Sequence, residues 1–283
     1  MMPIIEFENV SIKVRAYTNP TPTLKETFLS LFGKHKGATS FTEFYALRDI
    51  NLTFYEGERI GILGLNGAGK STMLKVIAGI YYPHAGRVTV RGKVTPLIET
   101  RAAINPELTG RDNIYQYGAI HCVPKEIIKQ KEQEIIEFSE LGDFINIPAK
   151  YYSTGMFSRL VFSIATMVDP DVLIVDEVFA AGDSSFVEKA TQRILSLMDN
   201  SRAVFFVSHN IEQVLRICER IIILQEGKVI NDGPALEMAA FYRDNIVSKR
   251  KIGMINRFLA EKLKERNQKS DLQESDSNQK QPD

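Results

Sequence analysis

The feature that most constrains the fold of this 283-residue chain is a glycine-rich loop that ends in Lys-Ser-Thr. The segment GLNGAGKST, from Gly64 to Thr72, matches the pattern G-x-x-x-x-G-K-[ST] completely. The apolar run RIGIL precedes it and predicts a strand, and TMLKVIAGI follows it and predicts a helix that begins at Lys70. A glycine-rich turn that contains Lys-Ser by chance is the alternative, but such a turn needs no strand before it and no helix after it. The order strand, loop, helix therefore predicts a phosphate-binding loop.

Each residue type in this loop has a chemical role. The glycines allow backbone N–H groups to converge on phosphate oxygens. Lys70 is placed to reach the β- and γ-phosphates of a nucleotide, the Ser71 hydroxyl to hold Mg²⁺, and Thr72 to add a contact at the start of the helix. The predicted nucleotide ligands in the loop are Gly64, Asn66, Gly67, Gly69, Lys70, Ser71 and Thr72.

Strands and helices alternate along the chain and predict an α/β fold with a largely parallel sheet. IIEFENVSIKV and ALRDINLTFYEGERIGILGL predict strands near the N-terminus, and DVLIVDE and AVFFVSHN have the character of buried parallel strands. Residues 125–142 predict an amphipathic helix, and RIIILQEGKVINDG predicts a hairpin that turns at EGK. Residues 18–44 predict a long excursion between two strands, because prolines and glycines surround one short amphipathic piece. Residues 236–266 predict helix rich in Lys and Arg, and residues 267–283, nearly without hydrophobic side chains, predict disorder.

Three polar residues follow predicted buried strands. Asp176 ends LIVD, at the carboxyl end of a parallel strand, where it could hold Mg²⁺ through water. Glu177 follows it and could polarise a water in line with the γ-phosphate. His209 follows FFVS and could donate a hydrogen bond to that phosphate. The alternatives are a structural carboxylate pair, which would be costly to bury unpaired, and a histidine at a strand end without a function.

A second helix start lies in YYSTGMFSRL, residues 151–160, where Ser153, Thr154 and Gly155 precede an apolar-periodic run. The first N–H groups of a helix have no partner within it and carry partial positive charge, so they attract anions. This stretch contains no lysine and no evident base for the serine. Because such a start binds phosphate weakly by itself, we expect it to act only when another molecule presents the phosphate.

Composition excludes several classes of protein. Lys+Arg and Asp+Glu both total 35, and this zero net charge disfavours bulk binding to nucleic acid or to an anionic membrane. Cys122 and Cys218 have no metal-ligand spacing and indicate reduced thiols in a cytosolic protein. No apolar run approaches the ~20 residues of a membrane helix, and the N-terminus does not resemble a secretory signal. We expect a protein that is soluble by itself, with any membrane spans supplied by a partner.

The order of phosphate loop, YSTGM, LIVDE and SHN resembles the nucleotide-binding domain of ATP-binding cassette (ABC) proteins, over roughly residues 4–235. The resemblance implies a P-loop NTPase fold with a mixed core sheet, an antiparallel β subdomain and a helical subdomain. It places the nucleotide-binding domain at residues 1–238, with an insertion at 18–44 and the helical subdomain at about 100–165. Residues 239–283 would form a tail that begins as a basic helix and ends disordered.

In this family YSTGM corresponds to the signature motif, which binds the γ-phosphate of an ATP held by the other subunit. The signature of one chain would face Lys70 of its twin, and two ATP molecules would be sandwiched head to tail in a two-fold homodimer. The resemblance thus implies ATP and Mg²⁺ as ligands. The signature residues in trans are Ser153, Thr154, Gly155 and Met156, and the catalytic residues are Lys70, Glu177 and His209.

A finer resemblance is to the ATPase subunits that export O-antigen, capsule or teichoic-acid polymers from bacteria. It rests on YSxGM at Tyr152–Met156, on PELTG at Pro106–Gly110 and on the Asn113–Ile114 pair that follows. DEVFAAGDSSFVEK is also similar and would place Asp183 in a loop that crosses the dimer interface. The implied function is ATP hydrolysis that drives export of a lipid-linked polysaccharide. The chain would act at the cytoplasmic face of the bacterial inner membrane, bound to a separate permease through residues within 79–120.

The chain departs from the family pattern in two places. Val14 stands where an aromatic residue usually stacks on adenine, so Tyr17 is predicted to stack there, with Tyr45 as the alternative. The usual glutamine that links ATP to the membrane partner is not visible. Glu99 or Thr100 stands near its position, and either could contact Mg²⁺ or the attacking water.

The sequence also bears on three other functions. A chromosome or repair ATPase of the same superfamily would carry a long coiled coil before the signature, but no heptads are sustained there. A translation factor with tandem cassettes would need two phosphate loops, and the chain has one. An ABC ATPase for another cargo, lipid or drug, is opposed only by the resemblance of YSTGM and PELTG.

The segment SKRKIGMINRFLAEKLKER could pack on its own domain or across a dimer, or face a membrane or a partner.

Overall fold

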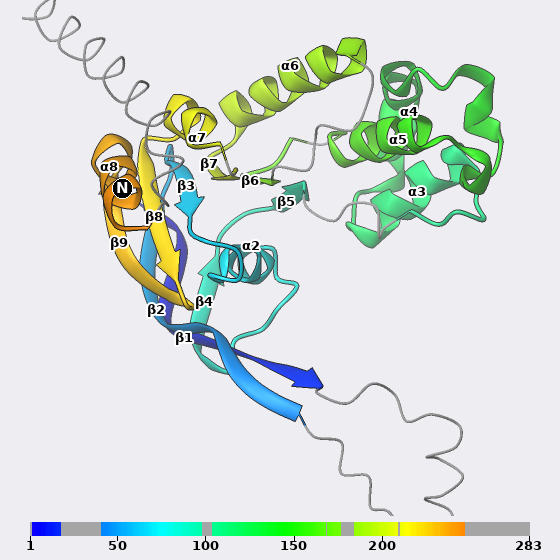
Figure 1. Cartoon of the computed structure of the whole chain (residues 1–283). Coiled ribbons are helices and arrows are strands. Elements are labelled where there is room, and N and C mark those ends of the chain that lie inside the picture. Colours follow the sequence, from blue (N-terminus) through cyan, green and yellow to red (C-terminus); the bar gives the residue numbers. More distant parts are fainter. Residues whose placement is uncertain are drawn as a thin grey trace, which may run out of the picture.

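The computed structural model describes residues 2–17, 41–97, 104–167, 169–176, 184–208 and 210–246. Two β-sheets share one core, and helices pack on the opposite face of the larger sheet (Figure 1). The family fold expected from the sequence, a mixed sheet with an antiparallel sheet and helices, is confirmed.

The larger sheet has six strands in the order β5-β6-β7-β3-β8-β9. The first five are parallel, and β9 pairs antiparallel with β8. The predicted hairpin is present, and its turn residues Glu226 and Gly227 have φ values of 49° and 75°, as a tight two-residue turn requires. The strands are β3 (Arg59–Leu63), β5 (Val94–Leu97), β6 (Val172–Asp176), β7 (Ala203–Val207), β8 (Arg220–Gln225) and β9 (Lys228–Pro234).

The smaller sheet is antiparallel, with β1 (Pro3–Tyr17) between β2 (Phe41–Tyr55) and β4 (Ala85–Val90). β2 begins four residues inside the segment 18–44 that was expected to be an excursion, so that boundary was wrong. The physical reason is pairing: β2 from Phe41 onward runs beside the last part of β1, where each strand satisfies the backbone groups of the other. The rest of that segment lies outside the described residues.

The first core lies between the two sheets and explains the apolar runs of the sequence. Phe54 of β2 meets Phe205 of β7 edge to face, with ring centroids 4.9 Å apart. Alternate residues of each central strand face opposite sides, and both sides are buried, so the strands read as continuous hydrophobic runs. In β6, for example, Ile174 belongs to the core between the sheets and Val175 to the core under the helices.

The helices divide between the two cores. α2 (Lys70–Ile77) packs into the core between the sheets, whereas the rest pack on the opposite face or beyond β5. Figure 1 shows α3, α4 and α5 gathered at one end of the molecule, away from the smaller sheet. The other helices are α3 (Gly110–Ile120), α4 (Lys125–Ser139), α5 (Thr154–Ala165), α6 (Ser184–Asn200), α7 (Ile211–Ile217) and α8 (Ala235–Asn245), with 3₁₀ turns η2 (Gly142–Asn146) and η3 (Ala149–Tyr151).

Two predicted helices are present, and the first is shorter than expected. The helix expected at 125–142 ends at Ser139, because Glu140 and Gly142 adopt left-handed φ values of 55° and 53°. The helix expected at 236–266 begins as α8, and the chain after residue 246 lies outside the described part.

Candidate nucleotide-binding site

The phosphate loop lies where the sequence predicts it, between the end of β3 and the first residue of α2, Lys70. Gly67 and Gly69 have φ values of 79° and 109°, which residues with a side chain rarely adopt. A Cβ on Gly69 would also lie 2.6 Å from the carbonyl oxygen of Ala46 in β2. Only glycine therefore lets the loop turn this closely against β2.

The start of α2 can accept an anion. Gly69 occupies the N-cap position and gives no side-chain cap, so the first N–H groups of the helix have no capping partner from that residue. The Lys70 ammonium donates to the carbonyl oxygens of Gly64 and Leu65, at 2.9 and 3.2 Å, and so lies within the curve of the loop. Positive charge and helix N–H groups therefore converge on one small volume.

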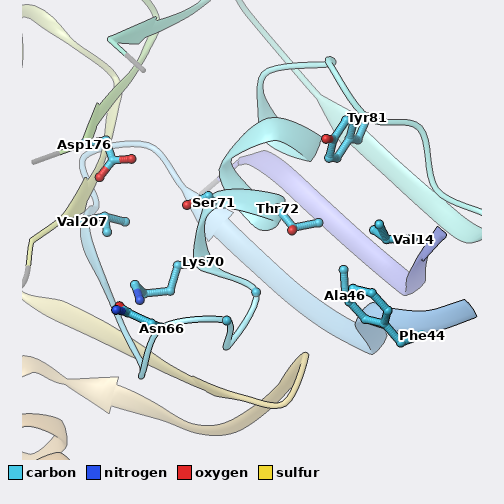
Figure 2. A pocket seen from close by; sticks show the side chains of 12 residues that line it. Val14, Phe44, Ala46, Asn66, Lys70, Ser71, Thr72, Tyr81, Asp176 and Val207 are labelled. Atoms are coloured by element: carbon cyan, nitrogen blue, oxygen red, sulfur yellow. The ribbon is translucent and has the colours of Figure 1, made fainter. Parts of the chain in front are cut away.

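Ser71 and Asp176 reach this volume from different parts of the sheet. Ser71 is the second residue of α2, and Asp176 is the last residue of β6, which is separated from β3 by β7. Both line the same cavity, and Figure 2 shows the carboxylate and the hydroxyl facing one another. One hydroxyl and one carboxylate, completed by phosphate oxygens and water, is the small protein ligand set that Mg²⁺ takes in nucleotide sites.

The cavity measures about 810 Å³ and has two unlike ends. Polar groups of the loop and of Asp176 lie at one end, and an apolar group that includes Val14, Phe44 and Ala46 lies at the other (Figure 2). The length and polarity of this arrangement suit a nucleotide, with its phosphates at the loop and its base against the apolar end. The lining residues are Val14, Phe44, Ala46, Asn66, Gly67, Gly69, Lys70, Ser71, Thr72, Tyr81, Asp176 and Val207.

The aromatic residues of the apolar end differ from those expected. Tyr45, the alternative candidate, does not line the cavity, because β2 alternates and turns it away from Phe44. The cations of Lys13 and Arg48 lie over its ring instead, 5.2 and 5.4 Å from the centroid. The side chain of Tyr17 is outside the described part.

Sequence reasoning missed Phe44 and Tyr81 as lining residues. Phe44 pairs with Val14 across the sheet, so it stands beside the position at which the family has its aromatic residue. That register depends on how β1 and β2 align, which no local pattern reveals. Val14 itself, noted as a departure, does line the cavity.

The second helix start does not join this cavity within one chain, since none of Ser153–Met156 lines it. Ser153 is the N-cap of α5, and its hydroxyl oxygen accepts a hydrogen bond of 3.2 Å from the Met156 N–H. A Cβ on Gly155 would meet only the Ser153 Oγ, at 3.9 Å, so no packing within the described chain requires a glycine there. The space beside Gly155 is open to an external group.

Five candidate site residues fall outside the described residues: Glu177, His209, Asp183, Glu99 and Thr100. Ser208 and Asn210, the neighbours of His209 in the sequence, are hydrogen-bonded. Ser208 is buried, donates to the side-chain oxygen of Gln213 at 3.0 Å, and accepts from the Asn210 N–H at 3.0 Å. These bonds fix the backbone at the end of β7, beside the strand that carries Asp176.

Comparison with known proteins identifies the family. A family model described as ABC transporter matches residues 47–180. The O-antigen export system ATP-binding protein RfbB of Klebsiella pneumoniae is 37% identical over 246 residues, which cover 86% of this chain and 98% of the relative. The chain belongs to the ATP-binding subunits of the ABC transporter family. This confirms the family expected from the sequence.

Other members of the ABC family support the same assignment. The teichoic acids export ATP-binding protein TagH of Staphylococcus epidermidis is 39% identical over 238 residues, covering 84% of this chain and 87% of the relative. Among solved structures, a dimeric ATP-binding cassette, MJ0796, in a post-hydrolysis state bound to ADP and Pi, is similar with a TM-score of 0.59. It is 25% identical, and the match covers 82% of this chain and 98% of that one.

Across the helices that the structure describes, none combines the length and the apolar character needed to span a bilayer.

Proposed function

We propose that this ABC subunit is the ATPase of a bacterial exporter that moves a lipid-linked polysaccharide, such as O-antigen, capsule or teichoic acid. The observation that carries the proposal is the joining of Lys70, Ser71 and Asp176 in one cavity of a chain this similar to O-antigen and teichoic acid export proteins. ATP is the proposed substrate, and its hydrolysis supplies the free energy for export. A separate permease supplies the membrane path, and the subunit works at its cytoplasmic face.

ATP is proposed to bind with its phosphates on the loop and its base against the apolar end. The N–H groups at the start of α2 and the Lys70 ammonium bind the phosphate oxygens, and Asn66 and Thr72 also line the cavity. Ser71 would hold Mg²⁺ directly, and Asp176 through water. When bound, the metal neutralises charge on the β- and γ-phosphates.

The base is proposed to stack on Phe44, beside Val14 and Ala46. Phe44 is 51% exposed, so its ring offers a face to a ligand without any rearrangement of the core. Tyr17, the residue first predicted for this role, remains a second candidate.

Hydrolysis is proposed to follow direct attack by water on the γ-phosphorus. Glu177, next to Asp176, polarises and orients the water, and His209, next to Ser208, donates a hydrogen bond to the γ-phosphate. As the new bond between oxygen and phosphorus forms, the bond to the β–γ bridging oxygen breaks and leaves ADP and phosphate. Glu99 remains a candidate for contact with Mg²⁺ or with the water.

A second copy of the chain is proposed to complete each site. The start of α5 lies away from its own cavity and has open space at Gly155, so Ser153–Met156 would bind the γ-phosphate held by a twin chain. Asp183 would cross the interface beside the opposite site. Two nucleotides would then lie between two chains, and hydrolysis would remove the γ-phosphates that join them.

The experiment that tests this arrangement is size-exclusion chromatography of Glu177→Gln with ATP and Mg²⁺. Glu177→Gln should bind ATP without hydrolysing it, and it should elute as a dimer only with the nucleotide. Adding Ser153→Arg should restore the monomer, because the arginine fills the space of the phosphate contact. Gln133→Arg, on an exposed position of α4, is the matched control and should leave the dimer intact. A monomeric Glu177→Gln, or a dimer that survives Ser153→Arg, would contradict the proposed sandwich.

The cargo needs a separate test with the permease present. Purified subunit and permease in liposomes should hydrolyse ATP faster when lipid-linked polysaccharide is added. Phospholipid alone, or a hydrophobic drug, should not have this effect. Equal stimulation by all three would refute polysaccharide as the specific cargo.

A further inference from the structure

Tyr152 directly precedes Ser153 and connects this part of the chain to η2 and to the start of α3. Its hydroxyl donates a hydrogen bond of 2.6 Å to the carbonyl oxygen of Phe144 in η2. A Cβ on Gly110, the first residue of α3, would lie 2.5 Å from the same hydroxyl oxygen, so the phenol fills the space that this glycine leaves. The ring itself packs against the core under the helices.

The ionisation of Tyr152 is consistent with this donor role. Burial raises the pKa of the hydroxyl above its ordinary value, and a hydrogen bond from the Gly110 backbone acts in the opposite direction. The hydroxyl therefore stays protonated near neutral pH and can donate to a carbonyl.

The segment before Tyr152 is also fastened to the loop before α3, so the attachment is rigid. An isolated antiparallel bridge joins the two segments, two backbone hydrogen bonds follow it, and one ion pair covers them. These contacts are Thr109 with Pro148, the Ala149 N–H to the Leu108 oxygen at 2.9 Å, the Lys150 N–H to the Pro106 oxygen at 2.8 Å, and Lys150 with Glu107 at 2.6 Å. The hydrogen bond of Tyr152 is the last of these contacts before Ser153, the N-cap of α5.

We propose that Tyr152 is a positioning residue for the trans phosphate site, because its hydroxyl sets where Ser153 and the first N–H groups of α5 stand. This inference rests on the proposed sandwich. An apolar side chain could fill the same space, but it could not fix the direction of the backbone through a hydrogen bond. The hydroxyl acts through Ser153 and does not itself touch the nucleotide.

The test uses the full chain with Glu177→Gln and compares two single-oxygen deletions. Tyr152→Phe removes the bonded hydroxyl, and Tyr151→Phe removes a hydroxyl from the neighbouring side chain, which is 70% exposed and lies against Lys150. The dimer dissociation constant is measured by sedimentation at saturating ATP and Mg²⁺. Tyr152→Phe should raise it about tenfold, because the start of α5 that the bond held in place must be ordered when the dimer closes, once at each of the two sites. Tyr151→Phe should leave it unchanged.

A second readout separates positioning from general loss of structure. The affinity of the monomer for a fluorescent ATP analogue, measured at low protein concentration, should be the same in all variants, because the phosphate loop lies elsewhere in the chain. In the hydrolysis-competent background at low protein concentration, Tyr152→Phe should lower kcat and leave the KM for ATP unchanged.

Gly110→Ala gives a second perturbation of the Tyr152 contact, and its Cβ would also lie 2.9 Å from the Ile145 Cδ1. Its Cβ would displace the Tyr152 hydroxyl and should weaken the dimer about as much as Tyr152→Phe does. The double variant should weaken the dimer by less than the sum of the two single effects, because phenylalanine has no oxygen for the new methyl group to meet and only its contacts with Ile145, at 2.9 and 3.2 Å, remain.

Each outcome bears on the inference. A dimer in Glu177→Gln that Tyr152→Phe and Tyr151→Phe weaken equally, or not at all, would overturn the role of Tyr152 and leave the sandwich intact. Additive effects of Gly110→Ala and Tyr152→Phe would also overturn it. Absence of any ATP-dependent dimer in Glu177→Gln would overturn the sandwich and the inference together.

Discussion

At the scale of single residues, neighbours in one strand have opposite surroundings. Phe44 lines the cavity, while Tyr45 on the other face of β2 contacts the cations of Lys13 and Arg48. The cause is the two-residue period of a strand, which sends successive side chains to opposite faces. Closeness in sequence to the expected position therefore does not show that an aromatic residue stacks on the base. The face of the strand on which the residue lies decides whether it can contact the base.

Phe44→Ala should weaken ATP binding about tenfold or more, because stacking of a base on an aromatic ring contributes about 1–3 kcal/mol. Tyr45→Ala, one residue away, is the matched control and should bind ATP as the wild type does. Isothermal titration of Glu177→Gln with ATP and Mg²⁺ measures both. Equal weakening of ATP binding by the two variants would show that the base does not bind on the face of β2 that carries Phe44.

At the scale of elements, a buried side chain organises the turn into α3. Asn113 is fully buried in the first part of this helix, and its amide reaches back to the segment before it. The bonds are from the Asn105 N–H at 2.8 Å and to the carbonyl oxygens of Asn105, Leu108 and Thr109 at 3.0, 3.3 and 2.9 Å. This one side chain holds the loop to which the segment before α5 is fastened.

Asn113→Ala should lower the free energy of unfolding by about 2 kcal/mol, since it leaves buried backbone groups without their partners. Urea denaturation followed by circular dichroism measures the change. Asn146→Ala is the control, because Asn146 is exposed and Arg111 is the one partner described for its side chain. The unfolding midpoint of Asn146→Ala should stay near that of the wild type. A midpoint for Asn113→Ala equal to that of the control would refute this account of the turn.

At the scale of the whole molecule, the two sheets are joined by their common core and by one arginine at its edge. Arg220 of β8 donates to the Thr53 carbonyl of β2 at 2.9 Å, and it forms ion pairs with Glu58 at 3.0 Å and Asp232 at 2.6 Å. The side chain is 22% exposed, and these carboxylates raise the pKa of its guanidinium further above its ordinary range. Arg220 thus connects β8 to the smaller sheet, to the turn before β3 and to β9.

Arg220→Met should destabilise the fold by about 2–3 kcal/mol, because it leaves two half-buried carboxylates facing each other without their cation. Thermal and urea unfolding should both report the loss. Arg15→Met removes the exposed pair of Arg15 with Glu43 and should leave unfolding unchanged. If the two arginine variants unfold alike, the junction at Arg220 does not hold the sheets together.

Much of this protein can be predicted from its sequence, because the decisive signals are local. The strand, loop and helix around Lys70 are contiguous, so the loop motif specifies its own context. The buried parallel strands are also visible in the sequence, because each is a short run of consecutive apolar residues. The order of the motifs was enough to identify the family. The roles given to Glu177, His209, Asp183 and Glu99 stay predictions, since the described residues do not include them.

The tertiary structure alone decided which distant residues meet. Ser71 and Asp176 share a cavity because β6, β7 and β3 lie in that order in the sheet, an order that no local pattern carries. Phe44 faces that cavity because β1 and β2 pair in one register, and a shift of one residue would have presented Tyr45 instead. The sequence by itself determined what each segment is and what chemistry it carries, since periodicity and motifs act over a few residues. Pairing and packing across the chain determined where those segments meet, since they depend on contacts between residues far apart in it.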